Sequence, residues 1–304
     1  MKVGKFFVEI FKKRMISLDK NRLKKFNIDR HYRSLLDVPY LNDEEDHHRF
    51  DVFYADEDVR RKIVIIDIHG GTYIFGSRKN AVHFQEIFLN QGFDFIALDY
   101  LPNDGNHNIQ NIISDCVEAL NYIAKNLKEL GLEDCKFVLT GDSAGGHISL
   151  LLAELLNNEG LSKKLGLKIE GLNFDAVLVN CPVYMYEIFA DDNAILNKNG
   201  IKRIFGPKYL IEEGYKELYS PHTHIKDIKI PVFISTCKRD FLRHHSLALN
   251  EDLDKLNNVK HYFIDIDSNE KLVDHVHNVV EPDLEVSIEV NQKMIDFILE
   301  VING

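Results

Sequence analysis

Short apolar runs alternate with longer amphipathic segments along most of this chain. The short runs are mostly continuous and apolar, which is typical of strands buried on both faces of a parallel sheet. They lie at 63–68, 94–99, 136–140, 176–181, 230–236 and 261–266. The longer segments carry apolar residues at three- and four-residue spacing, as amphipathic helices do. They lie near 80–90, 108–129, 144–158, 245–257 and 284–302. This alternation predicts an α/β fold with a mostly parallel central sheet and helices on both of its faces.

One interval, residues 183–225, breaks the alternation. It is rich in Tyr, Phe, Asn and Lys, and it is far longer than the roughly 4–6 residues of a usual connection. In α/β proteins ligands bind at the carboxyl ends of the strands, and an insertion of this kind most often covers that edge. We therefore predict that 183–225 forms a helical lid.

Composition and charge narrow the class of protein. The chain has 304 residues, 45% apolar and 28% charged, as in ordinary globular proteins. No apolar run approaches the roughly 20 residues that a membrane-spanning helix needs, so stable membrane insertion is not expected. The formal net charge of -11 repels phosphate backbones, which argues against nucleic acid as a partner. The four cysteines are scattered, and charges interrupt the apolar runs of residues 1–20, which therefore lack the pattern of a secretory signal. These features predict a cytoplasmic protein with reduced cysteines.

The amino terminus differs from the rest of the chain in its charge. Residues 1–33 carry eleven Lys or Arg against three acidic residues, whereas the remainder is strongly acidic. One helical face collects the apolar residues Val3, Phe6, Phe7, Ile10 and Phe11. Such a face is compatible with weak association of residues 1–16 with a membrane surface. A helix packed on its own domain is the commoner arrangement and the one we favour.

A serine with small neighbours carries the first chemical signal. Ser143 directly follows the predicted strand 136–140 and precedes a predicted helix, within Gly141-Asp142-Ser143-Ala144-Gly145. This is the G-x-S-x-G pattern in the strand–turn–helix context that it requires. The two glycines permit a sharp turn that exposes the hydroxyl, and the helix amino terminus favours developing negative charge. We predict that Ser143 is a nucleophile.

A serine nucleophile needs a base and an acid that orients the base. In this fold the expected chain order is serine, acid, histidine. Asp240 follows a late predicted strand, at the edge of the sheet where Ser143 is expected. The polar loop after the last strand contains His275 and His277, and one of them is expected to be the base.

Backbone donors for the oxyanion are expected after an early strand. The strand in "IVIIDIHGGTYIFGS" ends at His69 and continues into Gly70 and Gly71, whose backbone can approach a substrate closely. The amide of Ala144, directly after the serine, would complete the group of donors.

Together these motifs resemble the hormone-sensitive-lipase-like branch of the α/β-hydrolase family, over roughly residues 50–300. The resemblance rests on HGG after a strand, GDSAGG, the Asp of "KRDFLRHHS" and the late "DHVHNV". It implies Ser143 as nucleophile, Asp240 as acid and His275 as base. It also implies an oxyanion hole formed by Gly70, Gly71 and Ala144.

The resemblance also implies an amino-terminal helical cap over the pocket, which we assign to residues 1–50, with the hydrolase domain at 51–304. The chain departs from the family pattern in three places. Thr72 stands at the fourth position of HGGG, "DYLPNDGNH" replaces the YRLAPE segment, and His277 stands where relatives have an aromatic.

The predicted function is a serine hydrolase that cleaves small carboxylic esters, of short- to medium-chain acyl groups, through an acyl-enzyme. No cofactor is expected. No metal is expected either, because the His-x-His pairs at 222–224 and 275–277 lack accompanying ligands at a suitable spacing.

An amidase or peptidase of the same fold and a non-catalytic binding protein remain alternatives, and a homo-oligomer is left open. The aromatic residues Tyr73, Phe75, Tyr184 and Tyr186 are candidates for the acyl pocket, although such residues are as often plain core.

Overall fold

The computed structural model describes residue 13 and residues 32–80, 82–103, 107–186 and 214–304. Its centre is an eight-stranded sheet with the order β1-β2-β4-β3-β5-β6-β7-β8. The strands are β1 (Ser34–Pro39), β2 (Arg49–Phe53), β3 (Ile63–Ile68), β4 (Asp94–Leu98), β5 (Lys136–Asp142), β6 (Ala176–Asn180), β7 (Val232–Cys237) and β8 (His261–Ile266). The pairs β1–β2 and β2–β4 are antiparallel, and all pairs from β4 to β8 are parallel. The carboxyl ends of the parallel strands therefore share one edge.

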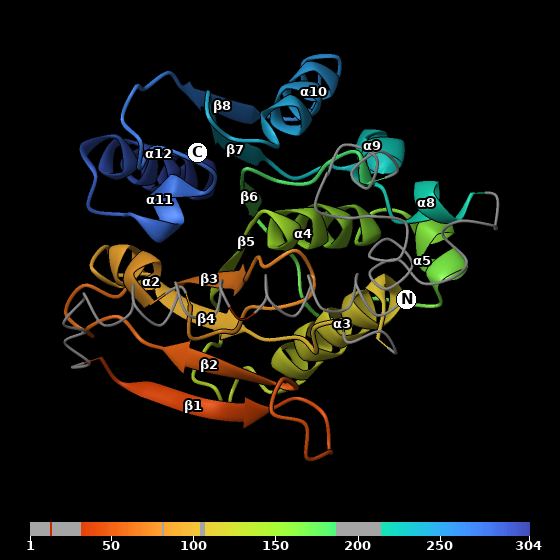
Figure 1. The fold of residues 1–304 in the computed structure, drawn as a ribbon. Coiled ribbons are helices and arrows are strands. Elements are labelled where there is room, and N and C mark those ends of the chain that lie inside the picture. The colour runs from red at the N-terminus through yellow and green to blue at the C-terminus, as the bar shows by residue number, and fades with distance from the viewer. Residues whose placement is uncertain (1–12, 14–31, 81, 104–106, 187–213) are drawn as a thin grey trace.

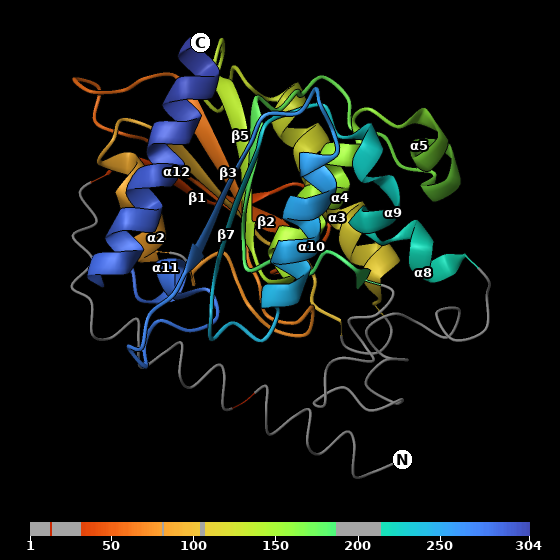
Figure 2. The same cartoon turned by 90° about the horizontal axis from the view of Figure 1, so that it is seen from above.

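Helices cover both faces of the sheet (Figures 1 and 2). One face carries α2 (Val82–Leu89), α11 (His277–Val280) and α12 (Glu285–Asn303). The other carries α3 (Ile109–Lys125), α4 (Ala144–Leu155) and α10 (Arg243–Asp254). The smaller helices α5 (Glu159–Leu165), α8 (Tyr215–Leu218) and α9 (Pro221–His224) lie beyond α4 in Figure 1. In the part of the chain that the structure describes, no helix is long and apolar enough to cross a bilayer.

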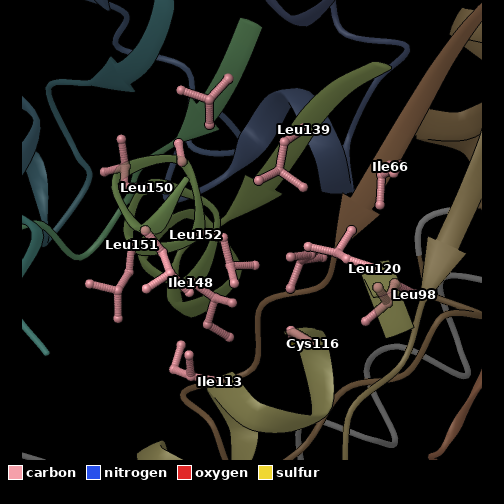
Figure 3. Close-up of a cluster of buried hydrophobic side chains, with 14 of the residues drawn as sticks. Ile66, Leu98, Ile113, Cys116, Leu120, Leu139, Ile148, Leu150, Leu151 and Leu152 are labelled. Atoms are coloured by element: carbon pink, nitrogen blue, oxygen red, sulfur yellow. The ribbon is translucent and has the colours of Figure 1, made fainter. Parts of the chain in front are cut away.

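The core is divided in two by the sheet, because successive strand residues point to opposite faces. In β3, Ile63 and Ile65 belong to the cluster under α2 and α12, whereas Val64 and Ile66 belong to the cluster under α3 and α4. Figure 3 shows part of the second cluster, in which Leu120 of α3 lies against the sheet. Full burial of each such side chain contributes about 1.5–3 kcal/mol relative to exposure. Burial on both faces explains the continuous apolar runs in the sequence.

The predicted α/β fold is confirmed, with all six predicted strands and all five predicted helices present within a few residues. The amino-terminal region differs from the expectation. Residues 34–53, most of which were assigned to the helical cap 1–50, form the two antiparallel strands β1 and β2. β1 is an edge strand with mostly exposed residues, so it lacks the apolar run by which a strand is recognised.

Some of the predicted segments lie largely outside the described residues. The amphipathic segment 1–16 is one of them, and with it most of residues 1–33. Of the predicted lid 183–225, residues 187–213 also lie outside. The described end of the lid, from residue 214, is helical in α8, α9 and the 3-10 turn Ile225–Asp227.

Candidate active site

Ser143 occupies the turn between β5 and α4. Its backbone has φ 53° and ψ -115°, a conformation that an L-residue rarely adopts and that neighbouring structure must enforce. The Ser143 N–H donates to the Asn180 carbonyl at the end of β6 (2.9 Å). A Cβ on Gly141 would lie 2.5 Å from the Gly145 carbonyl group, and one on Gly145 would overlap the carbonyl oxygen of Ile68. Both glycines are therefore required for the strand, turn and helix to pack this closely.

Asp240 and His275 form a hydrogen-bonded pair at the same edge of the sheet. Asp240 follows β7, and its Oδ1 lies 2.6 Å from His275 Nδ1. Oδ1 also accepts the Leu242 N–H (2.9 Å), while Oδ2 accepts the Thr236 hydroxyl (2.8 Å). Burial alone would raise the pKa of Asp240, but the hydrogen bond and charge of His275 and the two further donors hold it below its ordinary value. An ionised Asp240 requires a proton on His275 Nδ1, which leaves Nε2 as the proton acceptor.

His277 has a different environment from His275. Its Nδ1 lies 2.9 Å from Ser287 Oγ in α12, and the residue is buried. Burial lowers the pKa of His277 to about 4. The His275 side chain keeps 19% of its surface exposed and lies against Phe241, with ring centroids 4.4 Å apart. Geometry thus favours His275 over His277 as the base.

The other histidine pair considered from the sequence has no shared site either. His222 lies beside Asp252, with Nε2 and Oδ2 3.6 Å apart, whereas His224 Nε2 lies 3.3 Å from the Leu218 carbonyl oxygen. Each of the two rings thus contacts a different partner. These contacts do not direct both rings towards one ion.

The loop that carries His275 is also fixed by backbone contacts. Val276, directly after His275, has a positive φ of 55°. Its N–H donates to Cys181 Sγ (3.3 Å), at the end of β6. Cys181 itself has φ 48° and is buried. Two residues with positive φ, one directly after β6 and one directly before α11, therefore contact each other beside the Asp240–His275 pair.

The HGG loop follows β3 and is connected to the serine turn. The Gly70 N–H donates to Asp142 Oδ1 (2.9 Å), the residue before Ser143. Gly70 was predicted to be an oxyanion donor, but its amide is engaged by this carboxylate. This contact could not be predicted from the sequence, because it joins residues 72 positions apart and depends on the pairing of β3 with β5. Gly71, with φ 117°, follows directly.

His69 orients the beginning of this loop. Its Nε2 lies 2.9 Å from Asp99 Oδ1 and its Nδ1 2.7 Å from the Gly70 carbonyl oxygen. The ring also stacks on Tyr100, with centroids 4.3 Å apart. Asp99 was not predicted, and its only local signal is a carboxylate at the end of a predicted strand, 94–99.

The aromatic candidates for the acyl pocket are all buried in the core. Tyr73 places its hydroxyl 3.0 Å from His147 Nδ1, and Tyr184 donates to Asp252 Oδ2 (2.8 Å). The Tyr186 ring stacks on His147 at 4.7 Å. Phe75 is 8% exposed and belongs to the same cluster. These contacts account for the four side chains as core residues.

The fold and the arrangement of this edge define an α/β-hydrolase. The chain belongs to the BD-FAE family, an α/β-hydrolase esterase family, whose model matches residues 50–253. The inhibited esterase B of Lactobacillus rhamnosis has a TM-score of 0.87 at 20% identity, over 99% of this chain and 97% of that one. An esterase of Pyrobaculum calidifontis has a TM-score of 0.72 at 19% identity, over 94% and 91%.

A curated relative matches only part of the chain. It is the non-reducing polyketide synthase prhL of Penicillium brasilianum, 30% identical over 122 residues, which are 36% of this chain and 5% of that protein. The chain thus spans a small fraction of this relative. The similarity to solved structures supports the fold, and the family match confirms the predicted membership of the α/β-hydrolase family.

Proposed function

We propose that this protein hydrolyses small carboxylic esters with Ser143 as nucleophile, His275 as base and Asp240 as orienting acid. The observation that carries the proposal is the 2.6 Å contact between buried Asp240 and His275, at the sheet edge where Ser143 stands in its strained turn. β5, β7 and β8 are parallel strands of one sheet, and the three residues follow the carboxyl ends of these strands. A complete acid–base pair supports catalysis over a purely ligand-binding role.

The reaction proceeds in two proton-coupled halves. His275 Nε2 accepts the Ser143 proton as Oγ attacks the ester carbonyl, and the imidazolium then protonates the departing alcohol. Water, deprotonated by His275, then attacks the acyl-serine carbonyl; as the bond to Oγ breaks and the acid is released, the imidazolium returns its proton to Ser143 Oγ. Asp240 stays ionised and stabilises the transient imidazolium.

We assign the oxyanion hole to the amides of Gly71 and Ala144. The Gly70 amide is left out because Asp142 accepts it, and Gly70 instead fixes the loop. Amides fixed in this way need no reorganisation as charge develops, which is the main source of their catalytic effect.

For the acyl group we propose short to medium chains. Esterase B of Lactobacillus rhamnosis has been solved with a tributyrin phosphonate, and its fold extends over 99% of this chain. Butyrate and hexanoate esters are therefore the first substrates to test. The free, mostly buried cysteines are in keeping with a cytoplasmic location, which we retain as part of the proposal.

The test compares hydrolysis of p-nitrophenyl butyrate by the wild type, Ser143→Ala and the control Ser268→Ala. Ser143→Ala is expected to lower kcat by roughly 10⁴-fold or more, whereas Ser268→Ala, in the exposed loop after β8, should leave it unchanged. Mass spectrometry after treatment with a butyl phosphonate should place the adduct on Ser143. Equal rates in all three proteins, or an adduct elsewhere, would refute the assignment. A matched anilide measures any preference for amides.

A further inference from the structure

A second group of ligand-type side chains lies away from the Asp240–His275 pair. It consists of His48 in the loop between β1 and β2, His107 before α3, and Asp115 in α3. One nitrogen or oxygen atom from each lies within 4.8 Å of the other two. His48 thus meets two residues from the beginning of α3, about 60 positions later in the chain.

The imidazole of His48 has the geometry of a metal ligand. Its Nδ1 lies 2.7 Å from Asp43 Oδ2, so this nitrogen carries the proton. Its Nε2 is buried and has no hydrogen-bond partner among the described residues. The residue as a whole is 7% exposed. A buried nitrogen lone pair without a donor costs free energy unless something binds it.

The distance from His48 Nε2 to Asp115 Oδ2 is 3.5 Å. This is longer than the usual 2.7–3.2 Å of an N–H···O hydrogen bond. Two ligands of a tetrahedral Zn²⁺ with bonds of about 2.0–2.1 Å are about 3.3 Å apart. The spacing therefore suits two atoms that share one cation.

The surroundings of these atoms also favour a cation. Asp115 is buried, where a carboxylate is poorly solvated unless a charged partner compensates it. Its Oδ2 accepts the Leu101 N–H (3.2 Å), a neutral donor that leaves the carboxylate charge in place. Asp43 holds the far side of the His48 ring, as carboxylates do behind many metal-bound histidines.

We propose that His48, His107 and Asp115 bind a divalent transition-metal cation such as Zn²⁺. Two imidazoles and one carboxylate form a mixed ligand set that suits Zn²⁺, and water can occupy the fourth position. The cation would join the β1–β2 loop to α3. His47, the neighbouring residue, contacts Asp99 Oδ1 (3.2 Å), the same oxygen that faces His69. The site thus lies one residue from the contacts that orient the HGG loop.

The other group of ligand-type residues carries no such proposal. Cys181, Asp240 and His275 also lie within 4.8 Å of one another. There, however, His275 Nδ1 is already engaged by Asp240, and the Cys181 sulfur accepts the Val276 N–H. Those contacts explain the second group without an ion.

The test measures metal content and does not depend on esterase activity. Full-length protein is stripped with a chelator, dialysed with Zn²⁺ or Co²⁺ and passed through a desalting column. Wild type is expected to retain one equivalent of Zn²⁺, to give the visible absorption of tetrahedral Co²⁺, and to unfold several degrees higher with Zn²⁺. His48→Gln and Asp115→Asn should lose all three effects.

Two further variants sharpen the result. His261→Gln removes a histidine that faces Asp254 on the surface and should bind metal like the wild type. Asp43→Asn keeps the ligands and should weaken binding by about 10–100-fold. If the wild type retains no more metal than His48→Gln, the proposal is wrong, and His48 simply lies between Asp43 and Asp115 without a metal ion. Because Ser143→Ala should bind metal normally, failure here would be distinguishable from failure of the esterase assignment.

Discussion

At the scale of single residues, two buried carboxyl groups show how hydrogen bonding decides charge. Asp240 accepts three hydrogen bonds and is held ionised beside His275. Glu154, in α4, is equally buried, but neither carboxyl oxygen has a hydrogen-bond partner among the described residues. Burial and the charge of Asp227 raise the pKa of Glu154 well above its ordinary value. Asp240 is therefore ionised in the folded protein, whereas Glu154 is protonated and neutral.

Glu154 should make the protein less stable as pH rises. The folded state holds a proton that the unfolded chain releases above a pKa of about 4.5. The free energy of unfolding therefore falls above that pH, by up to about 1.4 kcal/mol per pH unit, until the raised pKa of the folded state is reached. Glu154→Gln cannot ionise. Its free energy of unfolding, measured with urea, should therefore rise relative to that of the wild type as the pH is increased from 5 to 8. A constant difference between the two proteins across that range would contradict this explanation.

At the scale of elements, the predictable parts are those whose signal is local. β3 to β8 are apolar runs of five to seven residues, and Ser143 is marked by glycines on both sides. β1 and β2 could not be recognised, because their side chains serve an edge hairpin with polar contacts. Asp51 of β2, for example, is buried with its carboxylate accepting the Asp37 N–H and pairing with Arg78, 27 residues later.

In the candidate site, too, some residues have a local signal in the sequence and others depend on contacts between distant segments. Asp240 and His275 could be chosen from chain order and position after strands, since parallel strands end at one edge. The hydrogen bond from the Gly70 N–H to Asp142 could not be predicted, because it depends on the pairing of β3 with β5. The structure also places Tyr73 and Tyr184 in the core, and an aromatic residue looks the same in sequence whether it lines a pocket or fills a core.

The serine turn should tolerate no side chain at Gly145. A methyl group there overlaps the Ile68 carbonyl oxygen, which belongs to β3 and cannot move without disturbing the sheet. Gly145→Ala is expected to cost about 3 kcal/mol in unfolding free energy and to lower kcat as the turn is displaced. Gly131→Ala is the comparison: its φ is positive, at 65°, whereas Gly145 has no positive φ, but the space around Gly131 is open, so the change should cost about 1 kcal/mol. Equal losses in the two variants would mean that the close approach at Gly145 costs no more than backbone strain alone and does not set a special requirement.

At the scale of the whole molecule, one arginine connects the edge hairpin to the HGG loop. Arg78 bonds Asp37 of β1, Asp51 of β2 (Nε to Oδ1, 3.1 Å) and Asp99 after β4 (2.9 Å). Burial raises the pKa of Asp99, but hydrogen bonds from His47 and His69 outweigh it and hold the pKa below its ordinary value. The chain has a net charge of -11, yet here it gathers three carboxylates around one cation. The hairpin is thereby connected through Asp99 to His69, at the start of the HGG loop.

Removing this cation should therefore affect both stability and catalysis. In Arg78→Met the side chain keeps its approximate length, but Asp51 and Asp99 stay buried, at 4% and 1% exposure, without their partner. Breaking a buried ion pair from one side costs about 3–5 kcal/mol. We expect that loss in urea unfolding, together with a lower kcat and little change in KM, because the loop would lose its orientation and not its substrate contacts. Arg243→Met removes an arginine whose side chain is 39% exposed and pairs with Asp265, and it should cost less than about 1 kcal/mol. If the two variants unfold at the same urea concentration with the same kcat, the Arg78 cluster is an ordinary surface network and the hairpin does not support the loop.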